Sequence, residues 1–368
     1  MKTIASWYVT IRFVLSYLFY KLGIGSVLDP NPRFDSFQFV IGQFTHWNRY
    51  IRVRGAENVA ADHPAIYCGN HIKFGDPFYV FHGVYLSTDK SVKLHAMSRN
   101  DFFEGTPLKT RFFDADEFIV TVGVHGISRD AVTLAQMKVF INMLIEGESF
   151  IMFPGRTRSR SGLLMEYRDN FVEPGSVSFF LNTAQRRKKG TTFSAIPVSR
   201  NYNPARDHTC MIYGPEQFLT SGASREEQRE YDFHLIETIG NLVEVCVPQV
   251  VSALLYSHCL HQISKTITVP TLKKQTRAIR EKSRHPYWDE EDDADLDAAV
   301  DLAIKYLARK KVLKRSGDDL HLNAAGILLA PDPESKYSEV NPVKYLTNQL
   351  LHLGDLIELI QDQVPRNS

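Results

Sequence analysis

The sequence of 368 residues has little cysteine and almost no net charge. Its four cysteines, Cys68, Cys210, Cys246 and Cys259, form no C-x-x-C pair and lack the cysteine–histidine spacing of zinc sites. We therefore expect four small core residues in a reducing compartment. The formal net charge of +1 gives no overall attraction to nucleic acid, so any cationic site has to be local.

Long uncharged hydrophobic runs are also missing. Residues 4–25 are rich in Trp, Tyr, Phe and Leu, but Arg12 and Lys21 divide them into runs shorter than the roughly 20 residues that span a membrane. No convincing signal-peptide cleavage site follows. A second aromatic segment occupies residues 34–53. We expect residues 1–50 to form two amphipathic helices that lie in the membrane interface; two core-packing helices of a soluble protein are the alternative.

The familiar nucleophile, phosphate-loop and metalloprotease motifs are absent as well. The chain contains no G-x-S-x-G, no Walker A sequence, no H-E-x-x-H and no G-x-G-x-x-G. A site that has a general base but no protein nucleophile would activate a substrate hydroxyl directly.

Short apolar runs alternate with segments whose apolar side chains recur at helical spacing. The runs lie at residues 63–71, 149–155 and 192–202, and the helical segments at residues 129–147 and 173–190. This alternation predicts an α/β fold with a mostly parallel sheet covered by helices on both faces.

Beyond residue 215 the pattern becomes mainly helical. Ser224-x-x-Glu227 is typical of a capping box, and the acidic run 289–297 places negative charge in the first turn of a helix. A hairpin is expected around Gly317. We therefore predict an N-terminal membrane-associating unit, a catalytic α/β domain and a mainly helical C-terminal region with a helix-hairpin module. Their bounds are residues 1–50, 51–215 and 216–368.

One predicted strand ends at His71, and Asp76 follows five residues later. In open α/β sheets, ligands bind outside the carboxyl ends of the strands. A histidine can act as a general base there, while a carboxylate holds its other ring nitrogen. On a regular helix this spacing would separate the two by roughly 140°. They meet only in an irregular turn, which Gly75 and Pro77 favour.

Another predicted strand ends in the segment FIMFPGRTRSRSG, residues 150–162. Its last eight residues, 155–162, are called the arginine loop here, and they include Arg156, Thr157, Arg158, Ser159 and Arg160. Arginine makes bidentate contacts to phosphate, and the hydroxyls add hydrogen-bond donors. The loop therefore predicts a phosphate site; a solvated basic loop is the alternative.

Together these loops resemble those of the glycerolipid acyltransferases, the glycerol-3-phosphate and 1-acylglycerol-3-phosphate acyltransferases. Asn70, His71 and Asp76 match the family's N-H-x4-D motif, and Arg129 matches the arginine that ends its second motif. The third motif, F-P-E-G-T-R-S-R-S/T-G, is matched at Phe153, Pro154, Thr157, Arg158, Ser159, Arg160, Ser161 and Gly162. Pro197 matches the strand proline of the fourth motif. Order and spacing agree across residues 65–200.

The resemblance implies direct acyl transfer. His71, oriented by Asp76, would take the proton of an acceptor hydroxyl that attacks the thioester of acyl-CoA or acyl carrier protein. No metal or redox cofactor is implied. The implied partners are a phosphorylated glycerol acceptor, an acyl thioester donor and the cytoplasmic face of a membrane; nucleic acid is not expected. The residues implied to bind substrate are Asn70, Arg129, Arg156, Thr157, Arg158 and Ser159.

Two features bear on activity and acceptor. Gly155-Arg156 stands where the family has Glu-Gly, which leaves a catalytically degenerate, lipid-binding member as an alternative. Residues 345–353, YLTNQLLHL, resemble the tail of the larger glycerol-3-phosphate acyltransferases, whereas Asn70 and Phe153-Pro154 are more typical of the lysophosphatidate type. We predict glycerol-3-phosphate as the acceptor, with 1-acylglycerol-3-phosphate as the alternative.

A third hypothesis makes the C-terminal helix-hairpin a winged-helix-like module that binds nucleic acid or a partner protein. The acidic run 289–297 disfavours DNA, because the phosphate backbone requires a basic face.

Overall fold

The structure is a computed structural model. It describes residues 11, 14–15, 17–19, 21–24, 51–73, 75–88, 92, 94–99, 123–127, 133–155, 158–165, 173–261, 264–332 and 335–364. The second amphipathic helix expected within residues 34–50 lies outside this part of the chain.

Within the described residues, seven strands form one sheet in the order β1-β7-β6-β2-β5-β3-β4. Their bounds are β1 Ile51–Arg54, β2 Ala65–Gly69, β3 Leu94–Arg99, β4 Val124–Ile127, β5 Ser149–Met152, β6 Ser194–Asn203 and β7 His208–Tyr213. Strands β6, β2, β5, β3 and β4 are parallel, while β7 pairs antiparallel with β6 and parallel with β1. The predicted fold class, a mostly parallel α/β sheet, is confirmed.

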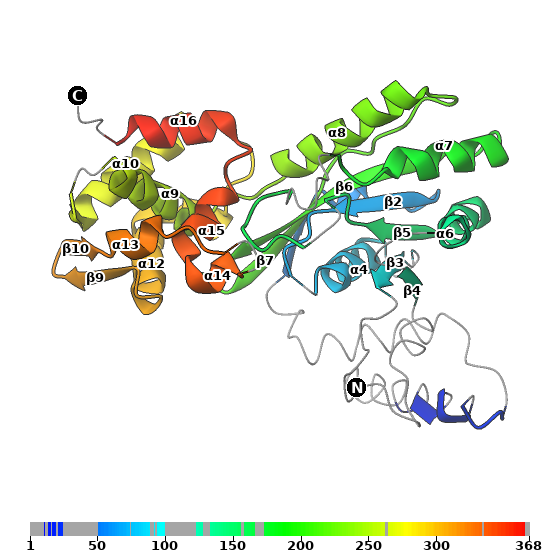
Figure 1. The fold of residues 1–368 in the computed structure, drawn as a ribbon, viewed down its shortest axis with the longest axis horizontal. Coiled ribbons are helices and arrows are strands. Elements are labelled where there is room, and N and C mark those ends of the chain that lie inside the picture. Colours follow the sequence, from blue (N-terminus) through cyan, green and yellow to red (C-terminus); the bar gives the residue numbers. More distant parts are fainter. Residues whose placement is uncertain are drawn as a thin grey trace.

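Helices cover both faces of this sheet (Figure 1). Tyr67 of β2 packs in the cluster that contains α4 (Asp76–Ser87). Its neighbour Ile66 points to the opposite face, where α6 (Leu134–Glu146), α7 (Val177–Arg187) and α8 (Arg225–Asn241) pack. Because successive side chains of a strand point to opposite faces, a strand covered on both sides is apolar throughout, as β2 is.

Helix α8 begins with the expected capping box of Ser224 and Glu227. Its buried residues Leu235, Ile236 and Ile239 belong to the core on the sheet. A second core begins at Val245. The change from one core to the other therefore falls after α8, and the predicted bounds of the three units stay a prediction.

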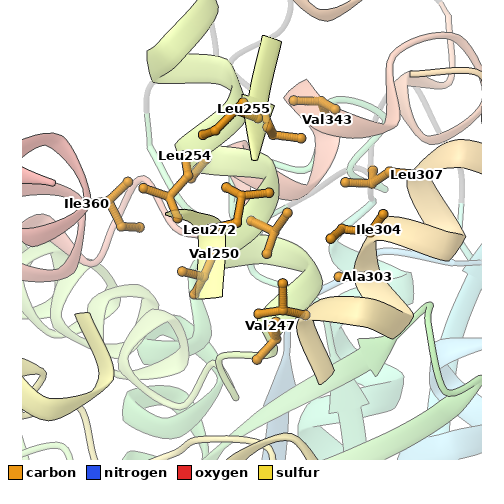
Figure 2. Packing of buried hydrophobic residues seen from close by; sticks show 14 of the residues in the cluster. Val247, Val250, Leu254, Leu255, Leu272, Ala303, Ile304, Leu307, Val343 and Ile360 are labelled. Atoms are coloured by element: carbon orange, nitrogen blue, oxygen red, sulfur yellow. The ribbon is translucent and has the colours of Figure 1, made fainter. Parts of the chain in front are cut away.

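The second core is built around α9 (Val247–Leu260), whose side chains meet those of the surrounding helices (Figure 2). The other elements are β8 Thr266–Thr268, α10 Val269–Lys282, α11 Glu290–Ala294, α12 Leu296–Arg309, β9 Leu313–Ser316, β10 Asp319–Leu322, α13 Ala324–Leu328, α14 Tyr337–Val340, α15 Pro342–Asn348 and α16 Gly354–Asp362. These elements begin in the order helix, strand, three helices and hairpin, and the strands pair in the order β8-β10-β9. The helix-hairpin is present, while its winged-helix-like character stays a prediction. The hairpin turns at Gly317, whose φ of 61° suits glycine.

Ion pairs join the two cores. Arg52 and Arg54 on β1 both pair with Glu244 at 3.3 Å. In the turn between β6 and β7, Arg206 pairs with Asp292 of the acidic run at 2.6 Å. The acidic run therefore begins helices, as expected, and also ties the C-terminal region to the sheet. All four cysteines are buried free thiols, which confirms their prediction as core residues.

Large apolar side chains are exposed among the described residues between positions 11 and 24. They are Ile11, Val14, Leu15, Leu18, Phe19, Leu22 and Ile24, each with 46–71% of its surface accessible. None of the helices within the described residues is both long and apolar enough to cross a membrane.

Candidate active site

His71 and Asp76 lie together at the carboxyl end of β2. The chain leaves the strand at Gly69, passes through an irregular turn and enters α4 at Asp76, with Pro77 in the first turn. His71 Nδ1 is 2.9 Å from Asp76 Oδ2. The irregular turn closes the five-residue spacing that a regular helix would have kept apart.

Asp76 is buried and held from several sides. Its Oδ2 accepts hydrogen bonds from the backbone N–H groups of Ile72 at 2.5 Å and Lys73 at 2.7 Å. Its Oδ1 accepts from Arg200 Nη1 at 3.0 Å. Burial opposes ionisation, but Arg200 and His71 outweigh it and lower the pKa of Asp76 below its usual range. The carboxylate is therefore a fixed anion that orients His71.

The remaining faces of the His71 ring are also defined. The ring stacks on Phe153, with ring centroids 4.4 Å apart and planes 21° apart. The side chain is 23% exposed. No hydrogen bond to its Nε2 is present among the described residues. Since Asp76 occupies Nδ1, Nε2 is the nitrogen available to a substrate proton.

Arg200 is the site residue that sequence analysis missed. It lies on β6, three residues after Pro197, and its side chain is 2% exposed. The guanidinium stacks over the ring of Tyr79, 4.3 Å from its centroid. The Tyr79 ring and the Asp76 carboxylate together fix its position. An arginine inside an apolar strand was the available signal, because such a charge is buried only with a partner.

Asn70 links β2 to β6. Its Nδ2 donates to the carbonyl oxygen of Arg200 at 3.0 Å, and its Oδ1 accepts from the Arg200 N–H at 2.7 Å. Both ends of the amide therefore fix the backbone beside the Asp76–Arg200 pair. The substrate contact expected of Asn70 stays a prediction.

The arginine loop reaches back to His71. The Ser159 N–H donates to the His71 carbonyl oxygen at 2.7 Å, and the buried Ser159 Oγ accepts from the Gly162 N–H at 3.0 Å. Arg158 precedes this anchor and has no hydrogen bond or ion pair within the described part of the chain. Its guanidinium is thus available for an anion. Arg129, Arg156 and Thr157 lie outside the described residues.

A small cavity of about 30 Å³ lies beside His71. Arg200 and Tyr202 line it from the sheet, while Gln249, Gln349 and His352 line it from the C-terminal region. The two cores therefore meet at the proposed base.

A cluster of His208, Glu244 and Asp289 offers three atoms of metal-ligand type. However, Arg52 Nη2 lies 2.9 Å from His208 Nε2, 3.3 Å from Glu244 and 3.2 Å from Asp289. Burial disfavours the Asp289 carboxylate, but hydrogen bonds from His208 and Asn203 hold its pKa well below the usual range. A guanidinium occupies the place that a metal would take, so this cluster is an ion-pair network between the two cores.

Residues 50–183 match the family model described as Acyltransferase. The match contains both the His71–Asp76 pair and the arginine loop. This stretch is similar to acyltransferase domains. The resemblance to the glycerolipid acyltransferases is confirmed at the level of this family model.

Among solved structures, the chain is similar to the 1-acyl-sn-glycerophosphate (LPA) acyltransferase PlsC from Thermotoga maritima. The identity is 15%, the match covers 65% of this chain and 97% of that chain, and the TM-score is 0.38. No curated protein matches the chain with significance.

Proposed function

We propose that this chain transfers a fatty acyl group from an acyl thioester to a hydroxyl of glycerol-3-phosphate. The single observation that supports this most strongly is the His71–Asp76 pair within an acyltransferase domain, with Nδ1 held by a buried carboxylate. An intact pair also speaks against the degenerate, lipid-binding alternative, since a protein without catalysis has no need of it.

The geometry suits general-base catalysis. His71 Nε2 removes the proton from the acceptor hydroxyl as its oxygen attacks the thioester carbonyl carbon. The tetrahedral intermediate then expels the thiolate, which recovers the proton from His71. Asp76 keeps the ring in one tautomer and stabilises the imidazolium that forms between the two steps. The thiol carrier is CoA or acyl carrier protein.

Arg158 is the proposed phosphate ligand among the described residues. It stands next to Ser159, whose backbone is bonded to the backbone of His71. A phosphate on this arginine would be held at a fixed place relative to the base, and such positioning lowers the barrier of the chemical step. Arg129, Arg156 and Thr157 are proposed to join it.

The choice of acceptor rests on the C-terminal tail. Residues 345–353 resemble the tail of the larger glycerol-3-phosphate acyltransferases, and part of this tail lines the cavity beside His71. This favours glycerol-3-phosphate over 1-acylglycerol-3-phosphate. We also propose a membrane-surface location on the cytoplasmic side, supported by the exposed apolar side chains of residues 11–24.

The test is acyl transfer from a long-chain acyl-CoA, and separately from acyl carrier protein. Glycerol-3-phosphate and 1-acylglycerol-3-phosphate are offered one at a time. His71→Ala is expected to lower turnover by about 10²- to 10⁴-fold, the usual contribution of a general base. His234→Ala, at an exposed histidine on α8, is the matched control and should retain wild-type turnover.

Turnover with 1-acylglycerol-3-phosphate alone would replace the proposed acceptor. Absence of turnover from folded protein with every donor and acceptor would refute the proposal and favour the degenerate member. The double substitution Gly155→Glu with Arg156→Gly would then ask whether the departure from Glu-Gly is the cause.

A further inference from the structure

The segment YLTNQLLH, residues 345–352, has two different faces and is called the docking segment here. Leu350 and, just beyond the segment, Leu353 are buried in the C-terminal core, and Leu346 is buried as well. Val343, one turn earlier, points into the same core around α9 (Figure 2). The end of α15 and the turn that follows it therefore present their apolar side chains to the C-terminal core.

The opposite face of the docking segment meets the acyltransferase domain. Asn348 Nδ2 donates to the Ser161 carbonyl oxygen at 2.9 Å. A Cβ added to Gly162 would lie only 2.2 Å from the Tyr345 carbonyl oxygen, so the two backbones are in close contact there. His352 Nε2 donates to the Gly240 carbonyl oxygen at the end of α8, at 2.7 Å.

A third contact with the arginine loop comes from a residue before the docking segment. The backbone N–H of Tyr337 donates to the Arg160 carbonyl oxygen at 2.9 Å. Three consecutive residues of the arginine loop, Arg160, Ser161 and Gly162, are therefore held by the C-terminal region. On its other side the same loop is bonded to His71 through Ser159.

Tyr345 extends the contact toward the base. Burial raises the pKa of Tyr345 to about 12, while Arg200 opposes and Asp76 adds to this rise. Its phenol therefore lies within electrostatic reach of the carboxylate that orients His71. Gln349 accepts a hydrogen bond from Gln249 of α9 at 2.8 Å, which ties the docking segment to α9.

We propose that the docking segment is a positioning element of the acyl-transfer site, and that Asn348 is the residue that holds the arginine loop in register with His71. Asn348 acts through the Ser161 carbonyl and touches no substrate. The loop supplies the proposed phosphate ligand Arg158, so a looser loop holds the acceptor less tightly. This role rests on the proposed function for its kinetic consequence, but the physical restraint on the loop does not.

The test replaces Asn348 by leucine, which keeps its approximate shape and removes the donor. Thr347→Val is the matched control. Thr347 is as buried as Asn348, at 6% and 7% exposure, but its hydroxyl donates within its own helix to Val343 and does not touch the loop. Both variants lose one hydrogen bond of a buried residue, so their stability costs should be similar.

Hydrogen exchange of the Ser159 and Gly162 amides is the first readout, because these amides anchor the loop. Asn348→Leu should speed their exchange roughly 2- to 10-fold, the range expected for one lost hydrogen bond, and Thr347→Val should not. The second readout is kinetic. The KM for the phosphorylated acceptor should rise by a similar factor in Asn348→Leu, whereas the KM for the acyl donor should not change.

Equal exchange of the loop amides in the two variants would overturn the positioning role, whatever the activity. If the wild-type protein transfers no acyl group, the exchange measurement still decides the role of Asn348, so failure of the proposed function is recognised separately. Should Asn348→Leu fail to fold, Asn348→Ser replaces it, because a serine hydroxyl is too short to reach the Ser161 carbonyl. Wild-type exchange in that variant counts equally against the proposal.

Discussion

Arg200→Met tests whether the buried guanidinium keeps Asp76 ionised and His71 oriented. The substitution keeps an unbranched side chain of similar length and removes the charge. Asp76 then remains buried with the hydrogen bonds from Ile72 and Lys73, but without the ion pair at 3.0 Å. Burial, the largest influence on this carboxyl, would no longer be offset by Arg200, so the pKa of Asp76 should rise.

The magnitude follows from the burial of both partners, at 2% and 0% side-chain exposure. Removing one partner of a buried pair leaves an uncompensated charge and costs about 3–5 kcal/mol of unfolding free energy. The cost depends on pH. In the wild type the pKa of Asp76 is lowered, so its contribution is present above the unfolded pKa and is lost as pH falls through the folded value. In Arg200→Met the folded pKa is raised, so stability falls as pH rises, and the gap between the two proteins widens toward neutral pH.

Activity should show the same change. We expect the acid limb of kcat/KM to move to higher pH in Arg200→Met, because a protonated Asp76 no longer holds His71 Nδ1 as an anion. Arg206→Met is the matched control, since Arg206 pairs with the buried Asp292 at 2.6 Å and its hydrogen bonds and ion pairs among the described residues involve neither His71 nor Asp76. It should lower the unfolding free energy without moving the acid limb.

Denaturant unfolding between pH 4 and 8 and kcat/KM over the same range measure both effects. An acid limb that stays at its wild-type position in Arg200→Met would refute the reasoning, since Arg200 would then have no influence on the carboxyl that orients the base. A stability gap that does not change with pH would refute the assignment of the cost to Asp76.

Two further predictions concern the loop and the membrane. Gly162→Ala should cost more unfolding free energy than Gly317→Ala, although both have positive φ, because only at Gly162 does the new Cβ meet a backbone oxygen. Equal costs by denaturant unfolding would show that the Tyr345 contact gives way freely. Phe19→Ala should weaken sedimentation with lipid vesicles about tenfold, from the apolar surface lost, while Leu134→Ala, at an exposed leucine of α6, should not; equal binding by both variants would exclude residues 11–24 as the membrane-facing segment.

Much of the sheet could be predicted from the sequence, because its central strands are buried on both faces. The apolar runs within residues 63–71 and 192–202 form β2 and the first part of β6. The reversal into β7 was missed, since a turn of four residues joins it to β6 and no long-range pattern marks its direction.

Contacts of the candidate site could be predicted where the two residues are close in the sequence, and could not be predicted where they are far apart. His71 and Asp76 are five residues apart, and Gly75 and Pro77 predicted the irregular turn that joins them. Arg200 lies 124 residues after Asp76, and nothing in a single sequence pairs an arginine of one strand with the carboxylate of another. The same limit applied to the acidic run, where Asp292 looked like a helix-starting charge and also binds Arg206 of the sheet.

The role of the C-terminal tail also depends on contacts between residues that are distant in the sequence. Residues 345–353 resemble the tail of the larger glycerol-3-phosphate acyltransferases. Their apolar side chains account only for the face that packs on the C-terminal core. The other face is polar, which in a sequence normally indicates solvent. Here it lies against the arginine loop, and Asn348 is 7% exposed. A buried polar side chain needs a partner, and that partner is the backbone of the loop that the acyltransferase motif defines. The tail is therefore better understood as a wall of the acyl-transfer site than as an appendage to it.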